Sequence, residues 1–121
     1  MSAFGDLLRE CREQRQLPQR TLSESANINQ ALISRFETGD RLPSGPEQVL
    51  ALARALQLND SEADTLLAAA GYWPRVYVEL GPRDQTLLLV ARFLTDPAIL
   101  PEKKDRFRQL LVLLAQEWLA P

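Results

Sequence analysis

Apolar residues recur at helical spacing along most of this chain, separated by short polar breaks. Near the N-terminus, Phe4, Leu7, Leu8 and Cys11 follow the spacing of one face of an amphipathic helix. This helix is expected over residues 3–15, with Arg9 on the face turned away from these apolar residues. The same periodicity predicts further helices over residues 18–25, 29–38, 46–56, 60–70, 82–95 and 101–119. The pattern therefore predicts an all-α fold.

The breaks after residue 15 contain residues that suit tight turns. Pro18 is acceptable as the first residue of a helix, although it lacks a side-chain capping bond worth about 1 kcal/mol. Asn27 tolerates the left-handed backbone, and Asn29 is a good N-cap for the next helix. Gly39 suits the end of that helix. We expect two short helices joined by a tight turn, the geometry of a helix-turn-helix motif.

The stretch from Tyr72 to Pro82 is different in kind. It contains Trp73, Pro74 and the short alternating run at residues 76–78, which we interpret as a linker or a packed crossover. We therefore expect one helical domain over residues 1–74. Residues 75–121 would supply the linker and two C-terminal helices.

The composition limits the chemistry that is available. The chain has no His and one Cys, which removes most zinc sites and all His-dependent catalytic triads. It also has no Gly-rich phosphate loop. We therefore expect neither an enzyme, nor a metal site, nor a cofactor. Cys11 lies on the apolar face of its helix, where a core position is more common than a redox switch.

The cellular location is predicted from the same sequence. No run of eighteen apolar residues is present, so we expect no membrane-spanning segment. The N-terminus has no basic region followed by an apolar one, and so no signal peptide is expected. A single Cys fits a reducing compartment. These observations predict a cytoplasmic protein.

The charge distribution bears on the choice of partner. The formal net charge is −2, which counts against a nucleic-acid binder. Residues 1–43 hold six Arg and six acids, residues 44–81 hold two and five, and residues 82–121 hold six basic residues and five acids. The acidity therefore lies away from the helix-turn-helix segment, and affinity for phosphates depends on the local surface. We expect weak non-specific binding to DNA.

The predicted helix over residues 29–38 has two unlike faces. Ile33 and Phe36 point to a core, which leaves a polar face on the outer side. Gln can pair with adenine and Arg with guanine in the major groove. This face is therefore a candidate for contact with bases. It consists of Gln30, Ala31, Ser34 and Arg35.

Spaced landmarks over residues 4–74 make the chain similar to the lambda-repressor-like helix-turn-helix family, also called the XRE type. They are Leu7-Leu8 with Arg12, Leu17-x-Gln19-x-x-Leu22, Ile28, Ile33-Ser34-x-x-Glu37-x-Gly39, Pro43 and the ending LLAAAGYWP. The resemblance implies a five-helix DNA-binding domain followed here by two C-terminal helices. Ser23 departs from the family, which usually has Ala there, and a buried hydroxyl would need a backbone partner.

The resemblance also implies roles for individual residues. Gln19 matches a residue that binds a backbone phosphate at a helix N-terminus, and Arg41 matches a loop contact to phosphate. Arg12 and Glu37 match an internal ion pair that tethers the first helix to the predicted helix over residues 29–38. In this family double-stranded DNA is the partner.

The two C-terminal helices carry more apolar residues than they could bury against each other. They either extend the core of a monomer or cover their apolar surface with a partner, and we favour a homodimer. A small-molecule pocket between them is possible, but no particular ligand is indicated. The expected dimer interface is Phe107, Leu110, Leu111, Leu114 and Trp118.

Together these features predict a dimeric transcriptional regulator, most simply a repressor on a pseudo-palindromic operator. The rival hypothesis is a protein-interaction module of the same fold, such as an antitoxin or adaptor. In that case the C-terminal helices would bind another protein. The near-neutral N-terminal third and the acidic middle of the chain favour this rival.

Overall fold

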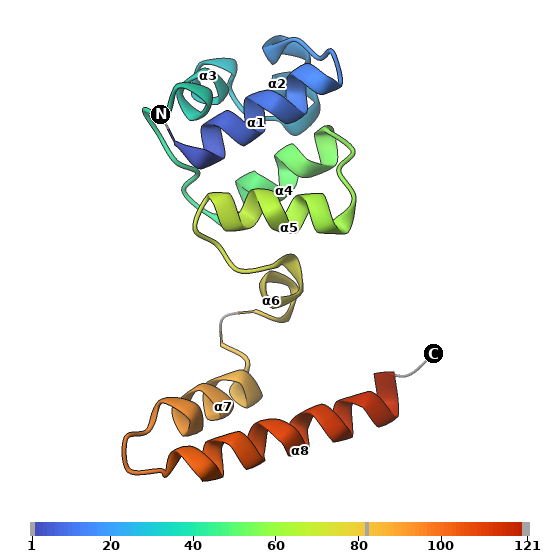
Figure 1. Cartoon of the computed structure of the whole chain (residues 1–121). Coiled ribbons are helices and arrows are strands. Elements are labelled where there is room, and N and C mark those ends of the chain that lie inside the picture. Colours follow the sequence, from blue (N-terminus) through green and yellow to red (C-terminus); the bar gives the residue numbers. More distant parts are fainter. Residues whose placement is uncertain (1, 82, 120–121) are drawn as a thin grey trace. The chain divides into compact units, whose positions relative to one another are not determined.

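The computed structural model describes residues 2–81 and 83–119, in which every regular element is a helix (Figure 1). The all-α prediction is confirmed. The chain forms two compact units, Met1–Gly81 and Pro82–Pro121. The first unit holds α1 (Ala3–Gln14), α2 (Gln19–Ala26), α3 (Gln30–Thr38), α4 (Pro46–Ala55), α5 (Asp60–Ala69) and α6 (Arg75–Leu80). The second holds α7 (Gln85–Thr95) and α8 (Pro101–Leu119).

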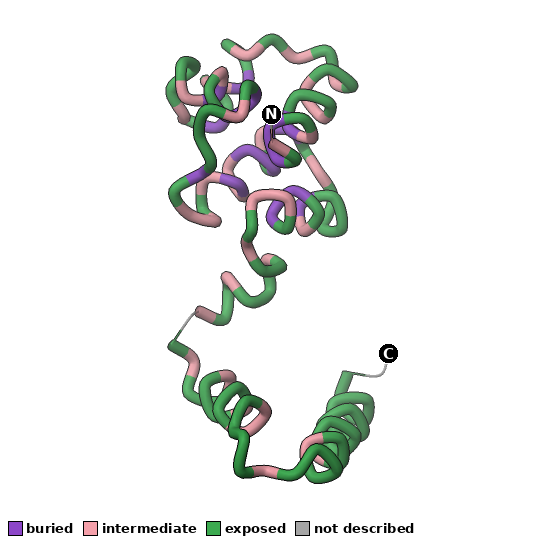
Figure 2. Tube along the Cα trace, turned by 60° about the vertical axis from the view of Figure 1, so that its left-hand side comes forward, coloured by how far each residue is buried: buried purple, intermediate pink, exposed green. Residues whose placement is uncertain are grey.

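The core of the first unit lies among α1 to α5, where the buried segments of Figure 2 are found. The ring of Phe4 in α1 packs edge-on against that of Phe36 in α3, with 5.8 Å between centroids. Burying side chains of this size contributes about 1.5–3 kcal/mol each. The core cluster is Phe4, Leu8, Leu22, Ala26, Ile33, Phe36, Val49, Leu52, Leu56, Leu66 and Leu67.

The turn between α2 and α3 follows the sequence prediction. Asn27 ends α2 in the left-handed region, with φ 56°, and the side chain of Asn29 accepts a hydrogen bond from the backbone N–H of Ala31 at 2.8 Å. The hydroxyl of Ser23 donates to the carbonyl oxygen of Ile28. This is the backbone partner that the sequence analysis required for a buried hydroxyl at Ser23. Gly39 closes α3 at φ 87°. These contacts fix the angle at which α3 leaves α2.

Close packing of α1 on α3 depends on Gly5. A Cβ atom at this position would collide with the carbonyl oxygen of Phe36 and lie 3.0 Å from that of Glu37. The backbone N–H of Gly5 is satisfied by the hydroxyl of Ser2 at 3.0 Å, which caps α1. The N-terminal turn of α1 therefore sits directly on the last turn of α3.

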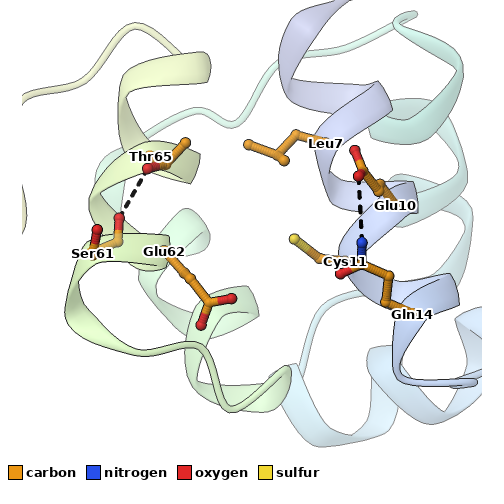
Figure 3. A pocket seen from close by; sticks show the side chains of 7 residues that line it. All are labelled: Leu7, Glu10, Cys11, Gln14, Ser61, Glu62 and Thr65. Atoms are coloured by element: carbon orange, nitrogen blue, oxygen red, sulfur yellow. Dashed lines mark hydrogen bonds between the residues drawn. The ribbon is translucent and has the colours of Figure 1, made fainter.

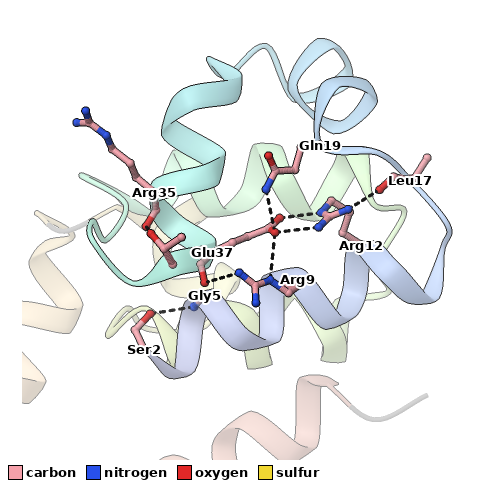
Figure 4. Close-up of polar contacts among 9 residues, drawn as sticks. Ser2, Gly5, Arg9, Arg12, Leu17, Gln19, Arg35 and Glu37 are labelled. Carbon is pink, nitrogen blue, oxygen red and sulfur yellow. Dashed lines mark hydrogen bonds and ion pairs between the residues drawn. The ribbon is translucent and has the colours of Figure 1, made fainter.

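A buried carboxylate, that of Glu37, joins α1, α2 and α3 (Figure 4). Glu37 in α3 has a fully buried side chain. Its Oε2 accepts from Nε of Arg12 at 2.7 Å, and its Oε1 accepts from Nη2 of Arg12 at 2.9 Å. Nε2 of Gln19, at the start of α2, donates to Oε1 at 3.1 Å. Arg12 also donates to the carbonyl oxygen of Leu17 at 2.9 Å, which ties the loop before α2 into the same cluster.

The surroundings of Glu37 keep its carboxyl group charged. Burial alone would raise the pKa, but the hydrogen bonds and positive charge supplied by Arg12, with hydrogen bonds from Gln19 and Arg9, lower it below its usual value. The same pairing raises the pKa of Arg12. A buried charge is stable only when its partners satisfy it, so Glu37 holds α1, α2 and α3 in one arrangement.

Residues 75–80, predicted as part of a linker or crossover, form the short helix α6 instead. The backbone N–H of Arg75 donates to a carboxylate oxygen of Asp64 in α5 at 2.9 Å, and its guanidinium pairs with Asp60 at 2.9 Å. Because α5 supplies both carboxylates, the first turn of α6 is held on α5. The alternating apolar pattern of residues 76–78 concealed this helix.

The second unit is a helical hairpin with no buried residue in its described part. The side chain of Asp84 accepts from the backbone N–H groups of Thr86 and Leu87, each at 3.0 Å, and so begins α7. Pro82, where the sequence predicted this helix to begin, lies outside the described residues. The rings of Phe93 in α7 and Phe107 in α8 pack with 4.6 Å between centroids.

The contact at Gly5 gives a stability test. Gly5→Ala should lower the free energy of unfolding by about 1–3 kcal/mol, because the added methyl group forces α1 away from α3. Urea unfolding followed by circular dichroism measures the loss. Gly45→Ala is the matched control, since its Cβ would meet only the end of the flexible Glu47 side chain. Equal effects of the two substitutions would contradict the close packing inferred for α1 and α3.

The Glu37 cluster predicts a dependence of stability on pH. Its folded pKa lies below the unfolded value of about 4.3. The stabilisation is therefore complete at neutral pH and is lost as the pH falls through the folded pKa. Glu37→Gln should cost about 3 kcal/mol at pH 7 and flatten the acid limb of the stability curve.

Glu24→Gln is the matched control for this variant. Glu24 pairs with Arg20 on an exposed face of α2 at 3.3 Å, where such pairs contribute little. Unfolding curves should show a small loss for this variant and an unchanged acid limb. A Glu37→Gln protein as stable as the control would remove the carboxylate from its central role.

Candidate nucleic-acid interface

The outer face of α3 is the only predicted base-contacting surface of the chain, and the structure leaves it open to solvent. Gln30, Ala31 and Arg35 are exposed and Ser34 is half-buried, while Ile33 and Phe36 are buried beneath them. In Figure 4 the Arg35 side chain points away from the Glu37 cluster. The four predicted side chains therefore share one face of a helix whose other face is fixed in the core.

The loop after α3 is tied to the same helix. The backbone N–H of Arg41 donates to the carbonyl oxygen of Arg35 at 3.3 Å, and the hydroxyl of Thr38 donates to the same oxygen at 3.1 Å. Arg41 is exposed. Arg41 therefore lies exposed just beyond the C-terminal end of α3, and its contact with phosphate stays a prediction.

Gln19 occupies a more complex position than the sequence suggested. Its side-chain amide is half-buried and donates to Glu37, so one of its amide hydrogens is held inside the domain. Pro18 provides no side-chain cap to α2. The backbone N–H groups of the first turn of α2 are left available to an acceptor such as a phosphate oxygen.

The predicted ion pair between Arg12 and Glu37 is present in the structure, with one addition. Arg9, which the sequence placed on the outward face of α1, reaches Glu37 as well. Its Nε lies 3.5 Å from Oε1, and its Nη2 donates to the Glu37 carbonyl oxygen at 3.4 Å. The sequence holds a signal for this contact that was missed. Arg9 stands one helical turn before Arg12, so the two side chains are neighbours on the helix surface and can reach the same carboxylate.

Cys11 lies in a small cavity of about 190 Å³ between α1 and α5 (Figure 3). The thiol is half-buried. Burial raises its pKa, and the nearby Arg15 only partly offsets this effect. A thiol with a raised pKa is mostly protonated at neutral pH and reacts slowly. The cavity is also lined by Leu7, Glu10, Gln14, Ser61, Glu62 and Thr65.

The residues predicted for a dimer interface lie in the second unit and are largely exposed. Leu110, Leu114 and Trp118 are 53%, 51% and 80% exposed. Leu111 is 39% exposed, and Phe107 is half-buried against Phe93. The interface itself stays a prediction, although these side chains have little cover within their own unit.

Two searches of the described residues bear on other kinds of site. Among residues 2–81 and 83–119, no group of three His, Cys, Asp or Glu side chains is arranged to hold a metal ion. No helix in that part of the chain combines the length and apolarity needed to cross a membrane.

Comparison with known proteins finds one matching family model and two similar helix-turn-helix regulators. Residues 3–66 match the family model described as a helix-turn-helix domain. The chain is 32% identical over 92 residues to the HTH-type transcriptional repressor RghR of Bacillus subtilis (strain 168), covering 76% of this chain and 66% of RghR. It is 38% identical over 72 residues to RghRB, an uncharacterized HTH-type transcriptional regulator of that strain, covering 60% and 50% of the two chains.

A solved structure is also similar in sequence. The restriction-modification controller protein C.AhdI from Aeromonas hydrophila is 31% identical, with a TM-score of 0.47, over 51% of this chain and 92% of its own. The chain spans between half and two thirds of the length of the two Bacillus relatives. Because the helix-turn-helix family model matches more than half of its residues, the chain belongs to the XRE-type, lambda-repressor-like helix-turn-helix family of regulators.

Proposed function

We propose that this chain is a sequence-specific DNA-binding transcriptional regulator that reads bases with α3. The observation that supports this most directly is the pairing of an exposed polar face with a rigidly held opposite face. Gln30 and Arg35 are exposed on α3, and Glu37 on the same helix is buried and hydrogen-bonded to α1 and α2. A reading helix needs this combination, because base contacts require side chains presented from a fixed backbone.

The side chains of α3 suit particular base edges. Arg35 can donate two hydrogen bonds to guanine O6 and N7, and Gln30 can exchange two with adenine N6 and N7. The small side chains of Ala31 and Ser34 permit a close approach, and Ala31 can contact a thymine methyl group. Recognition would therefore depend on a few contacts, with Arg35 the most discriminating of them.

Phosphate contacts would set the register of α3 in the groove. Arg41 and the open N-terminal turn of α2 lie in the same helix-turn-helix unit as the reading face. Gln19, with one amide hydrogen held by Glu37, would support the first turn of α2 and offer its remaining polar atoms to the phosphate. With six Arg balanced by six acids in residues 1–43, the electrostatic share of affinity should be small.

The regulator would act as a homodimer on a pseudo-palindromic operator, most simply as a repressor. One such domain covers one half-site, so two domains related by two-fold symmetry would bind half-sites about one helical turn apart. The exposed apolar residues of α8 supply the surface for this pairing. The similar regulators are bacterial, and operator DNA in a bacterial cell lies in the cytoplasm, so we propose this location for the chain.

Site selection from random duplex DNA tests base reading. The wild-type protein should enrich one palindromic site, and Arg35→Ala should relax one base pair in each half-site, a loss of about 1–3 kcal/mol of discrimination. Arg54→Ala is the control, because Arg54 is an exposed residue of α4 outside the proposed surface. If the wild-type chain enriches no site, the rival hypothesis of a protein-interaction module gains.

Salt dependence tests the phosphate contact of Arg41. Arg41→Ala should weaken binding to the selected site and to unrelated DNA by similar factors, and reduce the slope of log K against log salt by about 1 for each bound subunit. Arg41→Lys keeps the charge and should retain most of the slope. Fluorescence anisotropy at several salt concentrations measures both quantities. A change of base preference in Arg41→Ala would instead place Arg41 at a base edge.

A further inference from the structure

The helix α8 carries an apolar surface that its own unit leaves uncovered. Every described residue of α8 is exposed except Lys104 and Phe107, which are half-buried, and Figure 2 shows the helix almost entirely in the exposed colour. α7 covers α8 around Phe107, where Phe93 packs. The large exposed apolar side chains of α8 are Leu110, Leu111, Val112, Leu113, Leu114, Trp118 and Leu119.

One face of this helix has charges of opposite sign at its two ends. Lys103, Leu110 and Glu117 are spaced seven residues apart, so they lie almost in line along the helix. Leu114 lies beside this line, one turn beyond Leu110. Both charged residues are exposed, and within the described residues neither forms an ion pair.

The two halves of α8 also differ in total charge. The half from residue 110 onward has Glu117 as its single charged residue up to residue 119. The half before it has four cations and two acids, Lys103, Lys104, Arg106 and Arg108 with Glu102 and Asp105. A second α8 laid parallel would bring the basic halves together and Glu117 against its own copy. An antiparallel α8 would bring each acidic end to a basic end.

We propose that α8 pairs with α8 of a second copy of this chain, antiparallel and about a two-fold axis close to Leu110. Lys103 of each chain then lies beside Glu117 of the partner subunit, and Leu110 and Leu114 pack in the centre. The heptad spacing of these residues suits helices that pack along their length. The inference rests on the proposed homodimer and adds its surface, orientation and register.

Chemical cross-linking tests the orientation in the full chain, without DNA. Lys103 and Glu117 are about 21 Å apart along one helix. In a background of Cys11→Ser, co-expressed Lys103→Cys and Glu117→Cys chains should form a mixed cross-linked dimer with a short bis-maleimide. Either variant alone should not cross-link, because in the antiparallel pair identical positions are again about 21 Å apart.

Other patterns overturn the proposal. Cross-linking of each variant with itself, and not with the other, would show a parallel pair. A dimer that yields none of these products would have its interface elsewhere. A monomer in sedimentation equilibrium would show that α8 does not pair with a second copy. Since no step involves DNA, a failure of the proposed DNA reading leaves these results unchanged.

A charge-reversal cycle gives a second, independent readout. Lys103→Glu should weaken the dimer on the order of tenfold, because two symmetric attractions become two repulsions. The double variant Lys103→Glu/Glu117→Lys should recover most of this loss. Arg108→Glu is the control of equal charge change, since Arg108 lies on another side of α8, near Asp105 at 3.5 Å. A double variant weaker than Lys103→Glu alone would contradict the pairing.

Discussion

The buried carboxylate of Glu37 is the constraint on which the rest of the first unit depends. It belongs to the same helix as the exposed Arg35, and it is held by Arg12 from α1 and Gln19 from α2. A charge inside a protein is tolerated only when its partners are in place. The arrangement that satisfies Glu37 is therefore also the arrangement that presents α3 outward.

Other contacts of the domain also fix the orientation of α3, and they do so without burying a charge. Gly5 lets α1 approach the last turn of α3, and the bond from Ser23 to Ile28 fixes the turn before it. Apolar burial supplies most of the stability, but it is not directional. The short polar contacts decide which of many compact packings of the helices is adopted, and so they determine the angle at which the outer face of α3 is presented.

Much of this could be predicted from the sequence. Helical periodicity gave the helices of the core, and the left-handed turn at Asn27 followed from the tolerance of Asn for positive φ. The pairing of Arg12 with Glu37 came from resemblance to a family, since residues 25 positions apart have no local signal. Arg9 was missed although it stands one helical turn before Arg12, because helical periodicity alone placed it on the solvent face.

The remaining differences arise where tertiary contacts override local pattern. Residues 76–78 alternate like an extended segment, yet two carboxylates of α5 hold Arg75 at the start of a helix. Gln19 looked like a simple phosphate ligand, but the buried charge of Glu37 takes one of its amide hydrogens. The carboxylates that hold Arg75 and Gln19 are distant from them in the sequence. Helix propensity and residue spacing therefore could not predict these contacts.

An NMR titration with a selected duplex tests the central claim most directly, and a chain of 13.7 kDa suits it. If α3 reads DNA, the largest amide shifts should fall in residues 29–36, in the first turn of α2 and around Arg41. The buried side-chain contacts of Glu37 should stay unchanged. Shifts confined to α7 and α8, with α3 unaffected, would contradict base reading by this helix.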